Sequence, residues 1–125
     1  MNAKQVMELM KLPRTDAGNA ERLRRMFGRT WKYLPQYRSW VHWDGHRWDG
    51  RRTGDLSWAA KAAFEKLAME IFRLPVDPED EAEQSYRIKI IAWLIKSQID
   101  YHIRMAVKKF KEMLGEEETD EKERE

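Results

Sequence analysis

Residues 30–48 read TWKYLPQYRSWVHWDGHRW, and this stretch decides the fold class. Aromatic and β-branched residues alternate with polar ones along it, a pattern typical of strands on a half-buried sheet. It predicts a three-stranded antiparallel meander with strands near residues 30–34, 39–43 and 46–48. Asp44-Gly45 stands between the last two strands and predicts a type I′ turn, because that turn needs positive φ at both central residues.

The segments on both sides of this meander have helical periodicity, with apolar residues three or four positions apart. Thr15 is the expected N-cap of the helix that directly precedes the meander, and Gly28 is expected to end this helix. A long helix, capped by Asp55 or Ser57, is expected to end near residue 74. The other predicted helices span residues 3–12, 16–27, 78–95 and 98–114.

Local chemistry makes three further predictions for the second half of the chain. Asp77 is expected to cap the helix whose first residue is Pro78. Ser97, followed three residues later by Asp100, resembles a capping box and predicts the start of the last helix. The run IKIIAWLI at residues 88–95 is apolar nearly all round, which predicts a place at the centre of the bundle.

The predicted fold class is α+β, with a small antiparallel three-stranded β-meander packed against a bundle of four to five helices. Residues 1–13 are expected to form a short N-terminal helix, and residues 14–115 the single domain that contains the meander. Residues 116–125 hold seven acids and two bases and are expected to form a disordered acidic tail.

Charge is distributed unevenly along the chain, although the net charge is only +2. Residues 116–125 carry a net charge of −5, so the preceding residues carry +7. Between Arg14 and Arg52 there are ten basic and four acidic residues, a net charge of +6. A compact basic region of this kind favours a polyanionic partner.

The composition and motifs argue against several classes of function. The chain has no Cys, which removes disulfides and thiolate metal sites and indicates a reducing compartment. His42 and His46 flank the turn, but with so few ligands no metal or other cofactor is expected. No nucleophile elbow, HExxH motif or glycine-rich phosphate loop is present, so we expect no enzymatic activity. No apolar run is long enough to span a membrane and no signal-peptide layout is present, so the cytoplasm is the expected location.

Two motifs carry a resemblance to a known family. Residues 15–23 read TDAGNAERL, or TDxGNAxRL, and residues 40–48 read WVHWDGHRW, or WxxWDGxxW. In this order and at this separation they resemble the segment before the helicase core in phage- and plasmid-type and poxvirus-type DNA primase–helicases. The resemblance continues through WLIKSQ at residues 93–98 and covers residues 14–114. It implies a place in a mobile-element replication apparatus, although the ATPase and primase motifs of that family are missing.

The first motif has two interpretations. Gly18 beside a helix start offers backbone donors that can bind phosphate. The structural interpretation is favoured: Thr15 caps the helix, Asp16 lies at the positive end of the helix dipole, and Gly18 permits close approach of a neighbouring segment. Arg22 is expected to contact nucleic acid or to pair with an acid such as Asp44, and the sequence leaves both open.

Aromatic residues alternate with cations in and around the meander. Rings that stack on bases, set among cations that follow phosphates, are what a single-stranded nucleic acid requires. The alternative is a packed core of tryptophans with an incidental basic rim, although strand alternation does not allow all of them to be core. The basic residues of the last helix are more typical of a solvated face. The residues predicted to contact nucleic acid are Arg22, Arg25, Arg29, Lys32, Arg38, Trp43, Arg47, Trp48, Arg51 and Arg52.

The sequence therefore predicts a non-catalytic DNA-binding or coupling module of a phage- or plasmid-type replication system. Its expected partners are DNA, single-stranded or as a primer–template, and a replicative helicase or a primase/polymerase subunit; no membrane partner is expected. The alternative is a protein–protein adaptor of the replication complex that never contacts DNA, with Trp and Arg as anchors for a protein partner.

Overall fold

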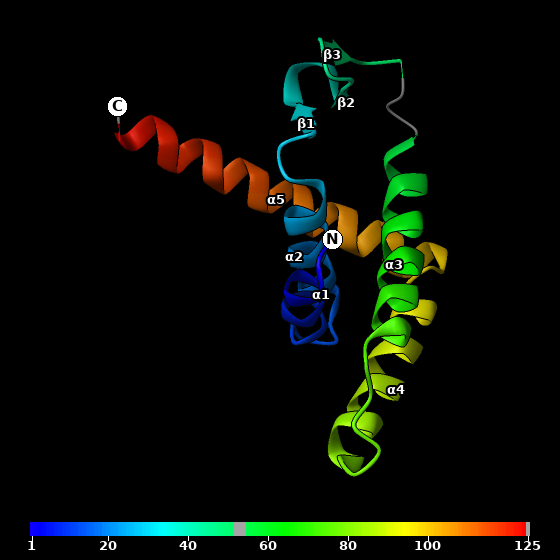
Figure 1. Cartoon of the computed structure of the whole chain (residues 1–125). Coiled ribbons are helices and arrows are strands. Elements are labelled where there is room, and N and C mark those ends of the chain that lie inside the picture. The colour runs from blue at the N-terminus through cyan, green and yellow to red at the C-terminus, as the bar shows by residue number, and fades with distance from the viewer. Residues whose placement is uncertain (52–54, 125) are drawn as a thin grey trace.

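The computed structural model describes residues 1–51 and 55–124, with side chains for residues 1–51 and 56–118. A small sheet lies at one end of the molecule, above the helices (Figure 1). In chain order the elements are α1 (Ala3–Met10), α2 (Asp16–Phe27), β1 (Trp31–Leu34), the 3-10 turn η1 (Pro35–Tyr37), β2 (Ser39–Trp43), β3 (Trp48–Asp49), α3 (Asp55–Arg73), α4 (Glu81–Lys96) and α5 (Asp100–Arg124). The predicted α+β class, a small meander packed against a helical bundle, is confirmed.

The three strands form one antiparallel sheet in the order β1-β2-β3, as predicted. The third strand begins at Trp48 and not at His46, so its predicted position is wrong. The predicted type I′ turn after β2 is wrong, because Gly45 has a positive φ of 102° and Asp44 does not. Instead, the Asp44 carboxylate accepts the backbone N–H groups of His46 and Arg47, at 2.8 and 2.9 Å. This Asx-type turn lengthens the loop to residues 44–47.

One face of the sheet belongs to the core. Trp31 is only 6% exposed. Trp40 stacks on Phe110 of α5, with ring centroids 5.5 Å apart and ring planes 4° apart. Because side chains alternate along a strand, Trp43 and its cross-strand partner Trp48 lie on the opposite face, where they are 39% and 42% exposed. The tryptophans of the meander therefore divide between core and surface.

The predicted boundaries of α2 are confirmed at both ends. The Thr15 hydroxyl accepts the Gly18 N–H at 2.9 Å, and Gly28 ends the helix with a φ of 60°. The N-terminal helix is confirmed as well. α3 begins at Asp55, so Asp55 and Ser57 lie inside the helix and the prediction that one of them caps it is wrong. The position before Asp55 lies outside the described residues.

Two predicted helix starts are wrong. Asp80 and not Asp77 caps α4, since its carboxylate accepts the Glu83 N–H at 3.0 Å, and Asp77 belongs to the preceding turn. The last helix begins at Asp100, and the hydroxyl of Ser97 is used in the core instead of at a cap.

α5 is longer than the sequence predicts. Residues 116–124, expected to form a disordered tail, continue the helix past Gly115. A glycine inside a helix costs only about 1 kcal/mol relative to alanine, and α5 packs along α2, so one glycine does not end it. No helix among the described residues is both long and apolar enough to cross a membrane.

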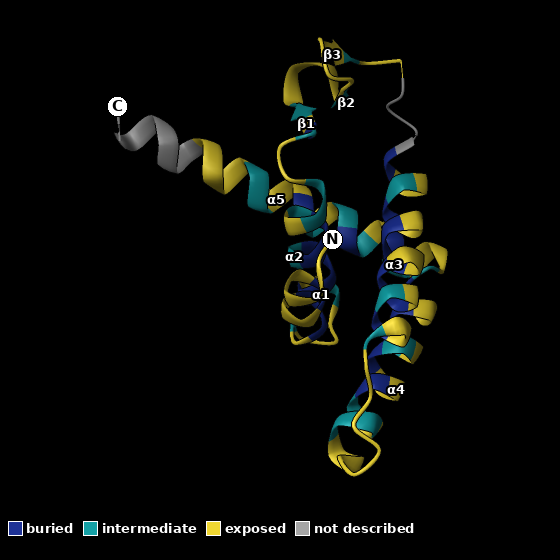
Figure 2. Ribbon diagram, in the orientation of Figure 1, coloured by how far each residue is buried: buried dark blue, intermediate teal, exposed yellow. Residues whose placement is uncertain are grey.

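α4 lies on the outside of the bundle, so its predicted central position is wrong (Figure 2). Its buried residues are Arg87, Ile90 and Leu94. Ile88 and Ile95 are 69% and 59% exposed. Together with α3 they form an apolar surface around a pocket of about 440 Å³. This surface, named the α3–α4 face below, consists of Met69, Phe72, Ile88, Ile91 and Ile95.

Candidate nucleic-acid interface

The first motif, residues 15–23, contains a fully buried arginine. The Arg22 guanidinium donates to the backbone oxygens of Leu9 at 3.1 Å, Pro13 at 2.9 Å and Leu12 at 2.5 Å. These carbonyls lie in the last turn of α1 and in the segment that follows it, where the helical hydrogen-bond pattern ends. Burial lowers the pKa of Arg22 to about 10. Arg22 therefore fixes α1 onto α2, and its predicted contact with nucleic acid is wrong, because its side chain is 0% exposed.

Asn19 joins this network to the second half of the chain. Its side-chain oxygen accepts from Arg22 at 2.9 Å and from the indole N–H of Trp93 at 3.0 Å. Its amide nitrogen donates to the Ser97 hydroxyl at 2.8 Å. Every polar atom of this buried amide side chain has a partner, which offsets the cost of its burial.

The remaining positions of the motif also have structural roles. A Cβ on Gly18 would lie 2.0 Å from the carbonyl oxygen of Pro13, so only glycine fits there. A carboxylate oxygen of Asp16 lies 2.7 Å from Nδ1 of His102 on α5. These contacts favour the structural interpretation of the motif, and residues 15–23 are named the buried motif below.

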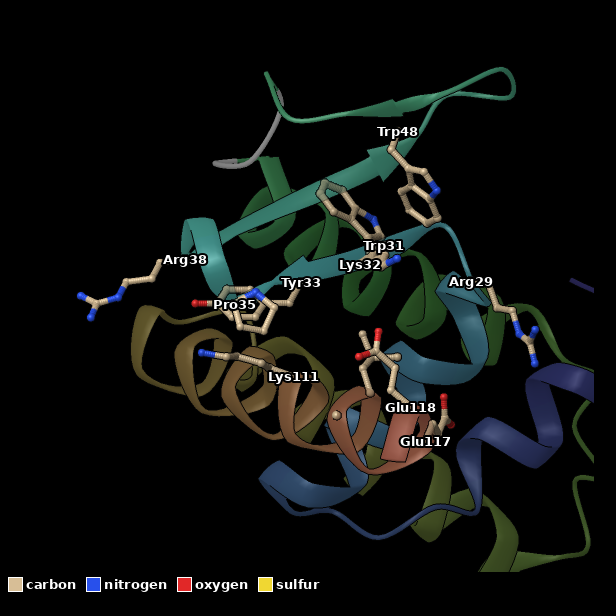
Figure 3. A pocket seen from close by; sticks show the side chains of 12 residues that line it. Arg29, Trp31, Lys32, Tyr33, Pro35, Arg38, Trp48, Lys111, Glu117 and Glu118 are labelled. Atoms are coloured by element: carbon tan, nitrogen blue, oxygen red, sulfur yellow. The ribbon is translucent and has the colours of Figure 1, made fainter. Parts of the chain in front are cut away.

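A groove of about 650 Å³ lies between β1 and the C-terminal part of α5 (Figure 3). It brings together four of the residues predicted to contact nucleic acid: Arg29, Lys32, Arg38 and Trp48. The other lining residues used below are Trp31, Tyr33, Lys111, Glu117 and Glu118. Four cations and two carboxylates give this surface, named the β1 groove, a net charge of +2.

Two lysine–aromatic pairs line the β1 groove. The Nζ atom of Lys111 lies 3.9 Å from the ring centroid of Tyr33, and the Nζ atom of Lys32 lies 5.9 Å from that of Trp48. The face of an aromatic ring attracts a cation electrostatically. Each pair therefore presents a positive charge and an aromatic face at the same place.

Arg38 reaches the groove from a strained backbone position. Its φ of 49° and ψ of 42° are left-handed, a conformation that costs a non-glycine residue about 1 kcal/mol. Its backbone N–H donates to the carbonyl of Pro35 at 3.2 Å and closes η1, while its side chain extends outward (Figure 3). Strained positions of this kind occur often at functional sites.

Two other predicted residues lie at the tip of the second hairpin, outside the groove. The Trp43 ring contacts Trp48 edge-on, with centroids 5.5 Å apart. The Arg47 side chain is 70% exposed and lies 3.9 Å from the carboxylate of Asp44. Both extend the exposed surface that begins at the groove.

Two further predicted residues, Arg25 and Arg51, do not line the groove. Arg51 makes two hydrogen bonds of 3.1 Å to Asp49, and this pairing holds the pKa of Asp49 at about 2. Arg25 lies 2.9 Å from Glu21 on α2. Arg52 falls outside the described residues.

Glu21 also binds Arg24, and the hydrogen bond from Arg24 is the main reason that the pKa of Glu21 falls to about 2. Arg24 in turn lies 3.5 Å from Glu117 on α5. The exposed arginines of α2 are thus paired with the protein's own carboxylates, whereas Lys32 and Lys111 of the β1 groove lie over aromatic rings.

A comparison with protein families shows where this chain belongs. The model of the family described as D5 N terminal like matches residues 20–125, most of the chain. The chain belongs to this family. Among curated proteins and among solved structures, nothing matches it. The predicted resemblance to the segment before the helicase core of primase–helicases is therefore confirmed, and this D5 N-terminal-like domain is related to primase–helicase replication proteins.

Sequence analysis missed Lys111 in this D5 N-terminal-like domain, because the basic residues of α5 look like a solvated face. Its neighbour Phe110 is buried, which carries α5 against β1 and brings Lys111 over Tyr33. Only tertiary packing reveals this contact. Within the part of the chain that the structure describes, no three acidic or histidine side chains gather as a metal site.

Proposed function

We propose that this domain is a non-catalytic DNA-binding and coupling module of a phage- or plasmid-type primase–helicase system. Family membership supports the replication context. The observation that carries the DNA contact is the β1 groove, where cations from separate segments line the same surface as two aromatic rings. The residues concerned are Arg29, Lys32, Arg38 and Lys111, with Tyr33 and Trp48.

The proposed mechanism is positional. Cations in the groove neutralise phosphates and release their counterions, which makes binding sequence-tolerant and sensitive to salt. Aromatic rings hold bases by stacking. Trp43 and Arg47, at the hairpin tip, extend the contact surface, and no covalent step is involved.

A salt titration of binding to a fluorescent oligonucleotide tests the proposal. Affinity is expected to fall steeply between about 50 and 200 mM salt. The logarithm of the binding constant should fall with the logarithm of the salt concentration, with a slope of roughly −0.7 per neutralised phosphate of a single strand. Replacing Lys32, Arg38 and Lys111 together by alanine should weaken binding at low salt and make this slope shallower by about 2 units.

A matched control removes the same charge from a different surface. Lys66, Lys89 and Lys96 are exposed on α3 and α4 and do not line the β1 groove. Their triple replacement by alanine should weaken binding much less than the groove variant. Equal losses in both variants would place the contact elsewhere, and no binding at about 50 mM salt would refute the DNA-binding proposal.

The α3–α4 face favours a second candidate function, a protein–protein adaptor. Phe72 and Ile88 are 76% and 69% exposed, and a helix that is apolar on all sides is normally covered. In this function the face docks the helicase or primase subunit of the same system. Phe72→Ser with Ile95→Ser should then abolish co-elution with that subunit in size-exclusion chromatography and leave DNA binding unchanged.

A further inference from the structure

The two lysine–aromatic pairs that line the β1 groove lie on the two sides of β1, because Lys32 and Tyr33 are neighbours in this strand and point to opposite faces of the sheet. Lys111 and Tyr33 form one pair, across the junction of α5 and β1, and Lys32 and Trp48 form the other, across β1 and β3. Figure 3 shows the Trp48 ring on the strand side of the groove and the Lys111 side chain on the helix side. A ligand that follows the groove past β1 meets two rings and two ammonium groups.

A nucleotide satisfies both members of such a pair at once. Its base can take the place of the ammonium group on the ring, and its phosphate can bind the ammonium group that has moved aside. Stacking of a base on a protein ring is stronger than an exposed cation–π contact, so the exchange is favourable. A ligand with only negative charge gains the lysines but not the rings.

We infer that the β1 groove is a site for unstacked nucleotides and therefore selects single-stranded over duplex DNA. This inference rests on the proposed function. In a duplex the faces of each base are covered by its neighbours, so rings of the protein cannot stack on them. A duplex can reach the rim cations only, whereas a groove of about 650 Å³ is within the size range of small-ligand sites, roughly 300–1,000 Å³.

The molecule contains a matched pair outside the groove. Trp58 on α3 is 72% exposed, and the Nζ atom of Lys61 lies 5.7 Å from its ring centroid. Among the described residues, those that line the two pockets beside Trp58 include Asp100, and Lys61 is the only lysine or arginine. Trp58 is thus an exposed tryptophan with a lysine partner, and it lies away from the other cations that line the β1 groove.

The test compares the full chain on oligothymidine of about 12 nucleotides and on the same strand annealed to its complement, at about 50 mM salt, by fluorescence anisotropy. Single strands are expected to bind about tenfold more tightly. Trp48→Ala should lower the affinity for single-stranded DNA about tenfold and leave the affinity for duplex DNA unchanged. Trp48→Phe keeps a ring and should stay within about threefold of the original protein, and Trp58→Ala should change neither affinity.

Circular dichroism melting checks that each variant folds. If Trp48→Ala does not fold, Trp48→Phe keeps the test decisive. Equal affinity for single strand and duplex, with Trp48→Ala neutral, overturns the inference and leaves the proposed phosphate-based DNA contact in place. An equal loss of single-strand affinity in Trp48→Ala and Trp58→Ala overturns the inference as well. Absence of binding to either DNA refutes the proposed function and the inference together.

Discussion

The buried motif, residues 15–23, and the hairpin motif, residues 40–48, differ in where their polar and aromatic groups lie. In the buried motif, Asn19 and Arg22 are 0% exposed, and fixed carbonyl and hydroxyl groups meet their polar atoms. In the hairpin motif, the rings of Trp43 and Trp48 are partly exposed because strand alternation turns them away from the core. Burial in this chain therefore follows the available hydrogen-bond partners and not the polarity of a residue alone.

Arg87 repeats the arrangement of Arg22 at a second helix end. It is 5% exposed and donates to the backbone oxygens of Ile71 at 2.6 Å, Leu74 at 2.7 Å and Pro75 at 3.0 Å. These carbonyls lie at and after the end of α3, as those bound by Arg22 lie at and after the end of α1. Two of the chain's arginines are thus structural, and only the exposed ones remain for a polyanion.

The largest expected effect is a difference between the two motifs in how far a substitution lowers the free energy of unfolding. Arg22→Ala leaves three backbone carbonyls and the Asn19 oxygen without this donor, and should lower the free energy of unfolding by about 3 kcal/mol. Arg47→Ala in the hairpin motif should change it by less than about 0.5 kcal/mol. Urea denaturation measures both, and similar values for the two variants would contradict the assignment of structural and surface roles.

The next effect tests how tightly the buried motif is packed. Gly18→Ala puts a methyl group against the Pro13 carbonyl oxygen and should lower the free energy of unfolding by about 2 kcal/mol, measured in the same way. Gly45→Ala is the matched control in the hairpin, where no atom lies within 4 Å of the added Cβ. Its cost should come only from the positive φ. A larger loss for Gly45→Ala than for Gly18→Ala would contradict the close approach at Pro13.

A smaller effect, a rise in the free energy of unfolding, is expected for a substitution just before the hairpin motif. Arg38→Gly relieves the left-handed backbone and should raise the free energy of unfolding by up to about 1 kcal/mol. The same change removes a groove cation and should weaken DNA binding several-fold. Arg38→Ala separates the two contributions, since it removes the cation and keeps the strain. An Arg38→Gly protein that is less stable would show that the side chain supports the fold.

The smallest effect is a pH dependence on the outer side of α2. The folded pKa of Glu21 is about 2, below its ordinary value of 4.5, so its stabilising contribution is complete above pH 4.5 and is lost as pH falls toward 2. The difference in melting temperature between the original protein and Glu21→Gln should therefore be largest near neutral pH and disappear near pH 2. With Arg24 and Arg25 both replaced by alanine, Glu21→Gln should have no such effect at any pH.

Features set by neighbouring residues could be predicted from the sequence. Thr15 and Gly28 end α2 as expected because a hydroxyl and a glycine act on the nearest backbone groups. The strands were predicted for the same reason, from alternation within a few residues. The turn type was wrong because Asp44 uses its side chain to accept two N–H groups, and α4 began late because Asp80 competes with Asp77 for the cap.

Features that depend on distant segments could not be predicted. Arg22 looks like an exposed cation until the end of α1 supplies its acceptors. Lys111 looks solvated until α5 lies against β1. The apolar run of α4 predicts burial, yet the described fold covers only one side of it. Within the candidate site, the sequence identified Arg29, Lys32, Arg38 and Trp48, and the structure added Lys111 and the groove that brings them together.

The acidic turn at the end of α5 has a kinetic consequence for the proposed function. Glu117 and Glu118 line the same groove as Lys111, so a strand held there feels repulsion at close range together with attraction. The long-range positive field that brings DNA to the surface survives, and association stays fast. Dissociation is accelerated, because differences in affinity at one surface are expressed mostly in the rate of release. Such a groove holds a strand briefly and lets it go, as a replication machine that moves along its template requires.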